Sequence, residues 1–297
     1  MTNDRRLRIA LQGELGSFSD EAIQQLWGGD AERLAYRDFA DVTAAVASGV
    51  ADRGVLPIEN TIVGSIAASH DAVNALPQLH AIAETVVAVH HCLLGAPTTS
   101  FKQVTMVLSH PVALAQCGRF FADNPQLEVH PVYDTAGAAM DVSRIADPTF
   151  AAVASRRAAS HYELAVLRAD IEDRPDNQTR FIGIAREPTP LPPGTPARTM
   201  IILTAADQPG ALLRALEPLA KHGANVRRVE TRPTGEPWSY RFFIEFDHES
   251  GDANAEAIVK GIAGAAGDVR LLGTYPRWDA GRRGSIGWKM EDGRGEK

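Results

Sequence analysis

The chain has 297 residues, of which 44% are hydrophobic and 23% charged. This composition is typical of folded globular proteins, and the length suffices for two domains. The formal net charge of −7, with basic residues interspersed among acidic ones, argues against a nucleic-acid-binding protein and favours a small-molecule partner. Cys92 and Cys117 lie far apart without a CxxC motif, which excludes a disulfide scaffold and fits a reducing cytoplasm.

The sequence contains no predicted targeting or membrane segment. The charged N-terminal residues run directly into a strand pattern, without the apolar stretch of a secretory signal. The most apolar window, residues 85–97, is interrupted by His90 and His91 and is shorter than the roughly 20 residues that a bilayer requires. We therefore expect a soluble, cytoplasmic protein.

Short apolar runs alternate with helix-like patterns in the first part of the chain. We expect strands at residues 8–12, 54–58, 105–109 and 149–154, each followed by a helix, and parallel sheets formed from them. Helix starts are predicted at Ser19, Asp41 and Thr135, and at Ser109 or His110 before Pro111. Gly49 predicts a helix end.

A proline-rich segment divides the chain. Residues 187–198, EPTPLPPGTPAR, contain five prolines, which favour an extended linker. After it we expect strands at residues 200–204, 225–231, 238–246 and 269–272, and helices at 210–222 and 253–263. This βαββαβ order is that of a ferredoxin-like domain.

Two polar clusters follow predicted strands. Residues 13–19, GELGSFS, form a glycine-containing turn whose N–H groups and hydroxyls suit a carboxylate or phosphate, or else a plain turn capped by Ser19. Residues 56–61, LPIENT, end a buried strand with polar side chains. Glu59 there suits general-acid work, but the residues alone favour Glu59 and Asn60 joining neighbouring loops.

Two further clusters begin predicted helices. In residues 109–117, SHPVALAQC, we expect a supporting role for His110 and no nucleophilic thiolate at Cys117, because no base stands beside it. Residues 134–139, DTAGAA, are small enough for a ligand to approach. His90 and His91 occupy adjacent positions of a predicted strand and form no ligand motif, so we expect no metal.

The polar run at residues 176–181, DNQTRF, leads directly into the apolar strand 182–185. It places an amide, a hydroxyl and a guanidinium at one strand edge. Ligand groups collect at such junctions in α/β sheets, so we expect a functional site here.

Eight motifs occur in one order, namely GELGSFS, PIENTIVGS, SHPVALAQC, DTAGAA, ASRRAASHYEL, NQTRF, PGALL and ETRP. Together they resemble the motifs of the prephenate dehydratase family, in which the last two belong to a phenylalanine-binding ACT domain. The resemblance covers nearly the whole chain. It implies an α/β fold with a two-lobed catalytic domain like type II periplasmic-binding proteins (residues 1–187), a linker (188–198), a ferredoxin-like ACT regulatory domain (199–278) and a flexible tail (279–297).

The resemblance also implies roles for individual residues. Thr179 becomes the principal catalytic residue, supported by Arg180 and Glu59. The implied substrate-binding residues around the cleft are Ser17, Ser19, Asn60, Thr61, Ser65, Thr135 and Phe181. The implied binding residues for the effector, L-phenylalanine, are Gly210, Ala211, Leu212, Asn225, Glu230 and Arg232.

The implied reaction is the decarboxylating dehydration of prephenate to phenylpyruvate in phenylalanine biosynthesis, catalysed by a carbon–oxygen lyase. The product ring becomes aromatic, so no metal or redox cofactor is needed. The Thr179 hydroxyl donates a hydrogen bond where charge develops on the leaving group, and Glu59 or a water supplies the proton. Arg180 either holds the side-chain carboxylate or forms a salt bridge that joins the lobes. Phe181 packs the cleft floor.

Some positions depart from the family pattern. Glu14 stands where a proline is usual, and Val112 where a glutamine is usual. DTAGAA is similar to the arogenate dehydratase version, so conversion of arogenate to phenylalanine remains an alternative, as does a non-catalytic amino-acid sensor. The exposed sheet edge of the ferredoxin-like domain favours a homodimer or a dimer-based tetramer.

Overall fold

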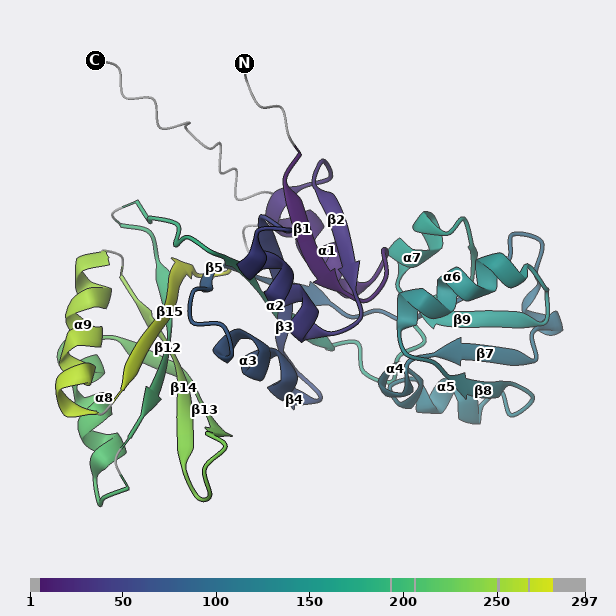
Figure 1. Cartoon of the computed structure of the whole chain (residues 1–297). Helices are drawn as coiled ribbons and strands as arrows, with labels where there is room; N and C mark the ends of the chain where they lie inside the picture. The colour runs from purple at the N-terminus through teal and green to yellow at the C-terminus, as the bar shows by residue number, and fades with distance from the viewer. Residues whose placement is uncertain (1–5, 193, 206, 250–251, 267, 280–297) are drawn as a thin grey trace, which may run out of the picture.

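The computed structural model describes residues 6–192, 194–205, 207–249, 252–266 and 268–279. The chain forms two α/β lobes followed by a smaller α/β domain. The first lobe lies between the other two parts, so that the second lobe and the C-terminal domain occupy opposite ends of the molecule (Figure 1).

The first lobe is built on a mixed sheet in the order β2-β1-β3-β11-β5, with β4 paired to β3. Strands β1, β2 and β3 are parallel, and β11 runs antiparallel to both β3 and β5. The elements of this lobe are β1 (Arg8–Gln12), α1 (Phe18–Trp27), β2 (Glu32–Tyr36), α2 (Phe39–Ser48), β3 (Arg53–Asn60), β4 (Gly64–Ser65), α3 (Ala67–Asn74), β5 (His80–Ala88) and β11 (Gln178–Ala185).

The second lobe has a sheet in the order β10-β6-β9-β7-β8. The chain enters this lobe after β5 and returns to the first lobe before β11, so two segments connect the lobes. The elements of the second lobe are β6 (Cys92–Gly95), η1 (Phe101–Gln103), β7 (Met106–Ser109), α4 (Pro111–Ala115), α5 (Gly118–Ala122), β8 (Glu128–Pro131), α6 (Thr135–Ile145), β9 (Phe150–Ala154), α7 (Arg156–His161) and β10 (Ala165–Arg168).

All four strands predicted in these lobes are present, and they pair in parallel as β1 with β3 and β7 with β9. The predicted strands thus pair in parallel, but both sheets are mixed because they also contain antiparallel strands. Strands β6 and β11 are the first strands after each crossing between the lobes. The chain enters each sheet there from the opposite end, so these strands are antiparallel to their neighbours. His90 and His91 lie in the first crossing and not on a strand, which corrects a prediction.

Three helices begin at a different residue than predicted. Helix α1 is capped by Ser17, whose Oγ accepts a hydrogen bond from the backbone N–H of Asp20, and not by Ser19. Asp134 caps α6 in the same way in place of Thr135. Helix α2 begins after Asp38, and Asp41 lies in its first turn, where a carboxylate interacts favourably with the helix dipole.

Two predicted helix boundaries are confirmed. His110 caps α4 before Pro111. Gly49 ends α2 with a φ of 81°, in the left-handed region that favours glycine.

The C-terminal domain has the predicted βαββαβ order, with a four-stranded sheet ordered β13-β14-β12-β15. Its elements are β12 (Ala197–Thr204), α8 (Ala211–Lys221), β13 (Asn225–Pro233), β14 (Tyr240–His248), α9 (Asp252–Ala265) and β15 (Val269–Pro276). Helices α8 and α9 cover one face, where they pack on a cluster that includes Ile201, Leu219 and Phe246.

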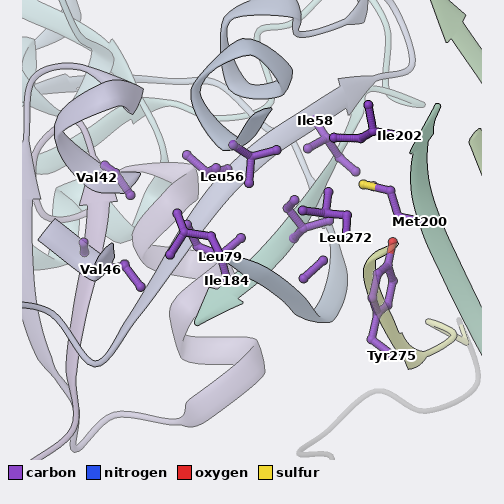
Figure 2. Packing of buried hydrophobic residues seen from close by; sticks show 14 of the residues in the cluster. Val42, Val46, Leu56, Ile58, Leu79, Ile184, Met200, Ile202, Leu272 and Tyr275 are labelled. Atoms are coloured by element: carbon purple, nitrogen blue, oxygen red, sulfur yellow. The ribbon is translucent and has the colours of Figure 1, made fainter. Parts of the chain in front are cut away.

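The other face of this sheet packs on the first lobe. Met200, Ile202 and Leu272 of the C-terminal domain join Leu56 and Ile58 of β3 in one buried cluster (Figure 2). The backbones approach closely here, since a Cβ on Gly273 of β15 would overlap the backbone of Ala81 in β5. The C-terminal domain is therefore docked through a shared hydrophobic core.

The proline-rich segment lies between the end of β11 at Ala185 and the start of β12 at Ala197. The predicted flexible tail falls almost wholly on residues 280–297, which lie outside the described residues.

Candidate active site

The strand pair β3 and β11 places the predicted catalytic residues on two different faces of the sheet. Thr179 lies opposite Asn60 in the ladder, and Arg180 lies opposite Glu59. Successive side chains of a strand point to opposite faces. Thr179 and Asn60 therefore share one face, and Arg180 and Glu59 share the other.

The hydroxyl of Thr179 is held by the amide of Asn60. Asn60 Nδ2 donates to Thr179 Oγ1 at 2.9 Å and to Asn177 Oδ1 at 2.8 Å. Asn60 Oδ1 accepts from the backbone N–H groups of Ile62 and Val63 at 2.9 and 3.0 Å. Because backbone N–H groups only donate, these bonds fix which end of the amide faces Thr179. Thr179 Oγ1 is thus an acceptor from Asn60, and its own hydrogen is free to point elsewhere.

Thr61 stabilises the same corner of the molecule. Its Oγ1 donates to the backbone carbonyl of Asp176 at 3.1 Å and accepts from the backbone N–H of Gln178 at 2.9 Å. The turn after β3 is thereby joined to the segment that enters β11. Asn60, Thr61 and Thr179 form one compact group. Asn177, fully buried, also belongs to it but was not among the predicted site residues, although it is the first residue of NQTRF.

Arg180 and Glu59 do not belong to this group. The Arg180 guanidinium lies 3.2 Å from Glu59, 3.1 Å from Glu84 and 2.6 Å from Glu245 of the C-terminal domain. Burial opposes the charge of Arg180, but Glu245 and Glu84 outweigh it and raise the pKa of Arg180. With three carboxylates bound, the geometry does not support the prediction that Arg180 holds a substrate carboxylate. Of the two alternatives it favours a salt bridge, which joins the C-terminal domain to the first lobe and not the two lobes.

The other predicted substrate-binding residues are dispersed. Ser17 and Ser19 are both buried, at the cap and in the first turn of α1, and Thr135 is the first residue of α6. Ser65 Oγ accepts from Arg228 of the C-terminal domain at 2.7 Å. Phe181 is 2% exposed and packs in the core beneath α1.

The loop of residues 13–19 lies directly against the second lobe. Ser155 Oγ donates to the Gly16 carbonyl at 2.6 Å, and a Cβ on Gly16, whose φ is +84°, would lie 2.7 Å from Ala158 Cα. Only glycine fits this position. The side chain of Arg157 also pairs with the buried Asp20 at 2.7 Å, so the lobes are in contact along this loop.

Glu14 has a structural role in this contact. Its backbone N–H donates to Asp134 Oδ2 at 3.3 Å, and its side chain accepts from the Tyr133 hydroxyl at 2.5 Å. A proline, usual at this position in the family, could not make the first of these bonds. Burial raises the pKa of Asp134, which Gly137 also binds through its backbone N–H at 2.8 Å.

Neither cysteine is poised as a nucleophile. Burial raises the pKa of Cys117 to about 12 and also raises the pKa of Cys92. Both thiols therefore stay protonated near neutral pH.

Within the described ranges, one group of possible metal ligands occurs, at the crossings between the lobes: His90, Asp170 and Glu172. Its oxygens already have partners. Glu172 binds His90 Nδ1 at 2.7 Å and the backbone N–H of His91 at 2.9 Å, and Asp170 pairs with Arg156 at 3.0 Å. The group acts as a polar contact between the two crossing segments.

The predicted effector residues lie in two places. Gly210, with a φ of +77°, precedes α8, which begins with Ala211 and Leu212. On β13, Asn225 is exposed, Glu230 lies 3.7 Å from Arg228, and Arg232 pairs with Asp71 of α3. Strand β13 is an edge of its sheet, and its residues Arg228 and Arg232 contact Ser65 and Asp71 of the first lobe.

The chain has two α/β lobes, with the hydroxyl–amide pair of Thr179 and Asn60 at their junction. A ferredoxin-like domain follows and is docked on the first lobe. These features define a two-lobed enzyme with an attached ACT domain. The prephenate dehydratase profile matches residues 9–189, and the ACT domain profile matches residues 199–264. The chain belongs to the prephenate dehydratase family.

Named relatives agree with this assignment. The chain is 34% identical to arogenate dehydratase/prephenate dehydratase 2, chloroplastic, of Arabidopsis thaliana over 93% of this chain and 74% of that protein. It is 31% identical to the bifunctional chorismate mutase/prephenate dehydratase of Escherichia coli (strain K12), over 92% and 72%.

Solved structures show the same fold. Prephenate dehydratase of Arthrobacter aurescens in complex with L-Phe superposes with a TM-score of 0.82 at 29% identity, covering 94% of this chain and 92% of that one. GqqA, described as a novel type of quorum quenching acylase, superposes with a TM-score of 0.82 at 33% identity, covering 93% and 100%. The described residues contain no helix that is long and apolar enough to span a membrane.

Proposed function

We propose that this protein converts prephenate to phenylpyruvate, with the Thr179 hydroxyl as hydrogen-bond donor to the departing ring hydroxyl. The observation that supports this is the bond from Asn60 Nδ2 to Thr179 Oγ1 at 2.9 Å. Since Asn60 occupies an acceptor site of that oxygen, the Thr179 hydrogen is directed away from Asn60. A donor with its direction set in advance stabilises developing charge without reorganisation.

In this reaction the bond from the ring to its carboxylate breaks, and its electrons form a ring double bond as the C–O bond to the hydroxyl breaks. Carbon dioxide leaves, and the departing hydroxide takes a proton and becomes water, so no oxidant or reductant is consumed. Glu59 is engaged by Arg180 on the other sheet face, so we assign the proton to a water and retain Glu59 as a supporting residue.

One set of assays distinguishes this function from three alternatives: an arogenate dehydratase, a non-catalytic amino-acid sensor, and an acylase like the one named for GqqA. The purified full-length protein is incubated with prephenate, with arogenate and with an N-acylated amine, and phenylpyruvate, phenylalanine and free amine are measured. We expect phenylpyruvate from prephenate. A larger kcat/KM for arogenate would make the protein an arogenate dehydratase, and no turnover with bound phenylalanine would make it a sensor.

The acylase activity named for GqqA is not favoured for this chain. An acyl-transfer nucleophile needs a base that removes its proton. Among the described residues the side-chain hydrogen bond to Thr179 Oγ1 comes from the Asn60 amide, which is not a base. Release of free amine at a rate comparable with prephenate turnover would overturn this assignment.

L-Phenylalanine is the proposed effector, bound at Gly210, Ala211 and Leu212 together with Glu230 and Arg232, while Asn225 and nearby atoms of a paired domain receive its ammonium group. A site shared between paired domains requires a homodimer or a dimer-based tetramer, for which we propose a cytoplasmic location. Edge strand β13 supports it, because Val226 and Val229 are 38% and 43% exposed there. Light scattering of the full chain should give at least twice the monomer mass, and Val229→Lys should lower it.

A further inference from the structure

A buried carboxylate of the ACT domain is linked to the catalytic strands by two arginines. Glu245 of β14 is 1% exposed and faces the first lobe. Its oxygens lie 2.6 Å from Arg180 Nη1 and 3.3 Å from Arg228 Nη1. Burial favours the neutral acid, but Arg180 and then Arg228 outweigh it and lower the pKa of Glu245. Glu245 is therefore charged and fixed by both arginines.

The two arginines lead from Glu245 to the two ends of a single turn. Arg180 Nη2 donates to Glu59 Oε2 at 3.2 Å, at the end of β3. Arg228 Nη2 donates to Ser65 Oγ at 2.7 Å, in β4. Glu59 and Ser65 are opposite each other in the β3–β4 ladder. One ACT-domain carboxylate thus holds both sides of the turn formed by residues 60–64.

This turn carries the Asn60 amide. The amide oxygen is bound by the N–H groups of Ile62 and Val63, within the turn, and the amide nitrogen binds Thr179. A change in the turn therefore changes the direction of the Thr179 hydroxyl. Positioning of this kind is sensitive, since about 1 Å of displacement can cost two orders of magnitude in rate.

We propose that Glu245 is a positioning residue for the catalytic site: from the ACT domain it holds Arg180 and Arg228, and through them the turn that orients Asn60 and Thr179. The catalytic lobe then depends on the docked ACT sheet for the geometry of its hydroxyl donor. The expected loss of activity rests on the proposed function. The expected change in the turn of residues 60–64 rests only on the contacts described above.

The test compares two charge-balanced double variants of the full-length protein. Glu245→Gln with Arg228→Gln removes the link to the turn without leaving an extra buried charge. Asp247→Asn with Arg227→Gln removes a neighbouring contact of 2.6 Å on the same two strands and leaves Arg198, which also binds Asp247, held by Glu84 at 3.0 Å. We expect the first variant to lose about tenfold in kcat with KM within about twofold, and the control to keep its kcat.

Amide hydrogen exchange of residues 61–66 supplies a measure that does not depend on activity. Exchange there should become about tenfold faster in the Glu245 variant and stay unchanged in the control. Equal effects in both variants, or an unaltered turn in a folded Glu245 variant, would overturn the inference. If that variant does not fold, Glu245→Asp keeps the charge but withdraws the carboxylate by one methylene, with the same expectation. If the wild-type protein does not convert prephenate, the proposed function is refuted, but the role of Glu245 in holding the turn is not.

Discussion

Thr179 is a residue whose chemistry depends on a single neighbour. Its side chain is 8% exposed, and the Asn60 amide that binds it is equally buried. The hydroxyl is a weak acid that stays protonated, so its contribution is a hydrogen bond with a set direction. Under the proposed function, this set direction is what allows threonine, a residue with little intrinsic reactivity, to act as the principal catalytic residue.

Replacing Thr179 by alanine should lower kcat/KM by about 10²–10³, because one transition-state hydrogen-bond donor is lost, while KM changes little. Thr179→Ser is the matched control, since it keeps the hydroxyl, and should retain most of the activity. Steady-state kinetics on folded variants checks this. Near-normal turnover by the alanine variant would remove Thr179 from the mechanism.

Glu59 gives a second prediction at this scale. Because its carboxylate is bound to Arg180 on the face away from Thr179, Glu59→Gln should lower kcat moderately and leave both limbs of the pH–rate profile in place. The profile is measured from about pH 5 to pH 9 with prephenate. Disappearance of the basic limb would instead make Glu59 the proton donor.

Among the secondary-structure elements, the start of α8 is where a single substitution should disrupt the proposed effector site. Gly210 has a φ of +77°, and a β-branched residue is strained there. Gly210→Val should therefore abolish the effect of phenylalanine on activity and on thermal stability. Gly223, at the other end of the helix with a φ of +65°, offers a matched control that is equally strained. Calorimetry with phenylalanine distinguishes the two variants, and unchanged affinity in Gly210→Val would place the effector site elsewhere.

Helix α3 meets the ACT sheet through a buried histidine. His70 is 1% exposed and packs edge-on against Phe243 at 4.9 Å between ring centroids. Burial, then the charge of Arg228, lowers the pKa of His70 to about 4, although nearby Glu245 acts in the opposite direction. The charge of Arg180 also lowers the pKa of His70.

The pKa of His70 has a consequence for stability. The unfolded chain takes up a proton at this residue near pH 6.5, whereas the folded chain does so only near pH 4, so stability falls as pH is lowered between these values. From pH 7 to pH 5 we expect His70 to account for a loss of about 2 kcal/mol. Urea unfolding at both pH values should show a smaller loss in His70→Gln than in wild type. An equal loss would assign the pH dependence to other groups.

For the whole molecule, docking of the ACT domain depends on close backbone approach. Because a Cβ at Gly273 would overlap the backbone of Ala81, Gly273→Ala must separate β15 from β5. We expect a loss of about 1–3 kcal/mol in the free energy of unfolding, with faster proteolysis of the segment between β11 and β12. Gly264, where a Cβ meets nothing within 4 Å, is the control. Unaltered stability and proteolysis of Gly273→Ala would show that the contact is not essential for docking.

Much of the fold was predictable because it depends on local signals. Alternating apolar runs and glycine and proline positions predicted β1, β3, β7, β9 and the whole βαββαβ order of the ACT domain. The reversed strands β6 and β11 were not predictable in this way. Their direction follows from the path of the chain between lobes, which no local pattern encodes.

The candidate site was also predictable from the sequence only in part. The sequence by itself determined the family, through the order of eight motifs, and brought Asn60 and Thr179 forward as candidates. Only the tertiary structure decided that Arg180, with Glu59 bound to it, faces the ACT domain. The other two carboxylates bound by Arg180, Glu84 and Glu245, lie 96 and 65 residues from it along the chain. Alternation along a strand shows that neighbours face opposite sides. Which side becomes the cleft and which the domain interface is set by the packing of whole lobes, and that depends on contacts between residues far apart in the sequence.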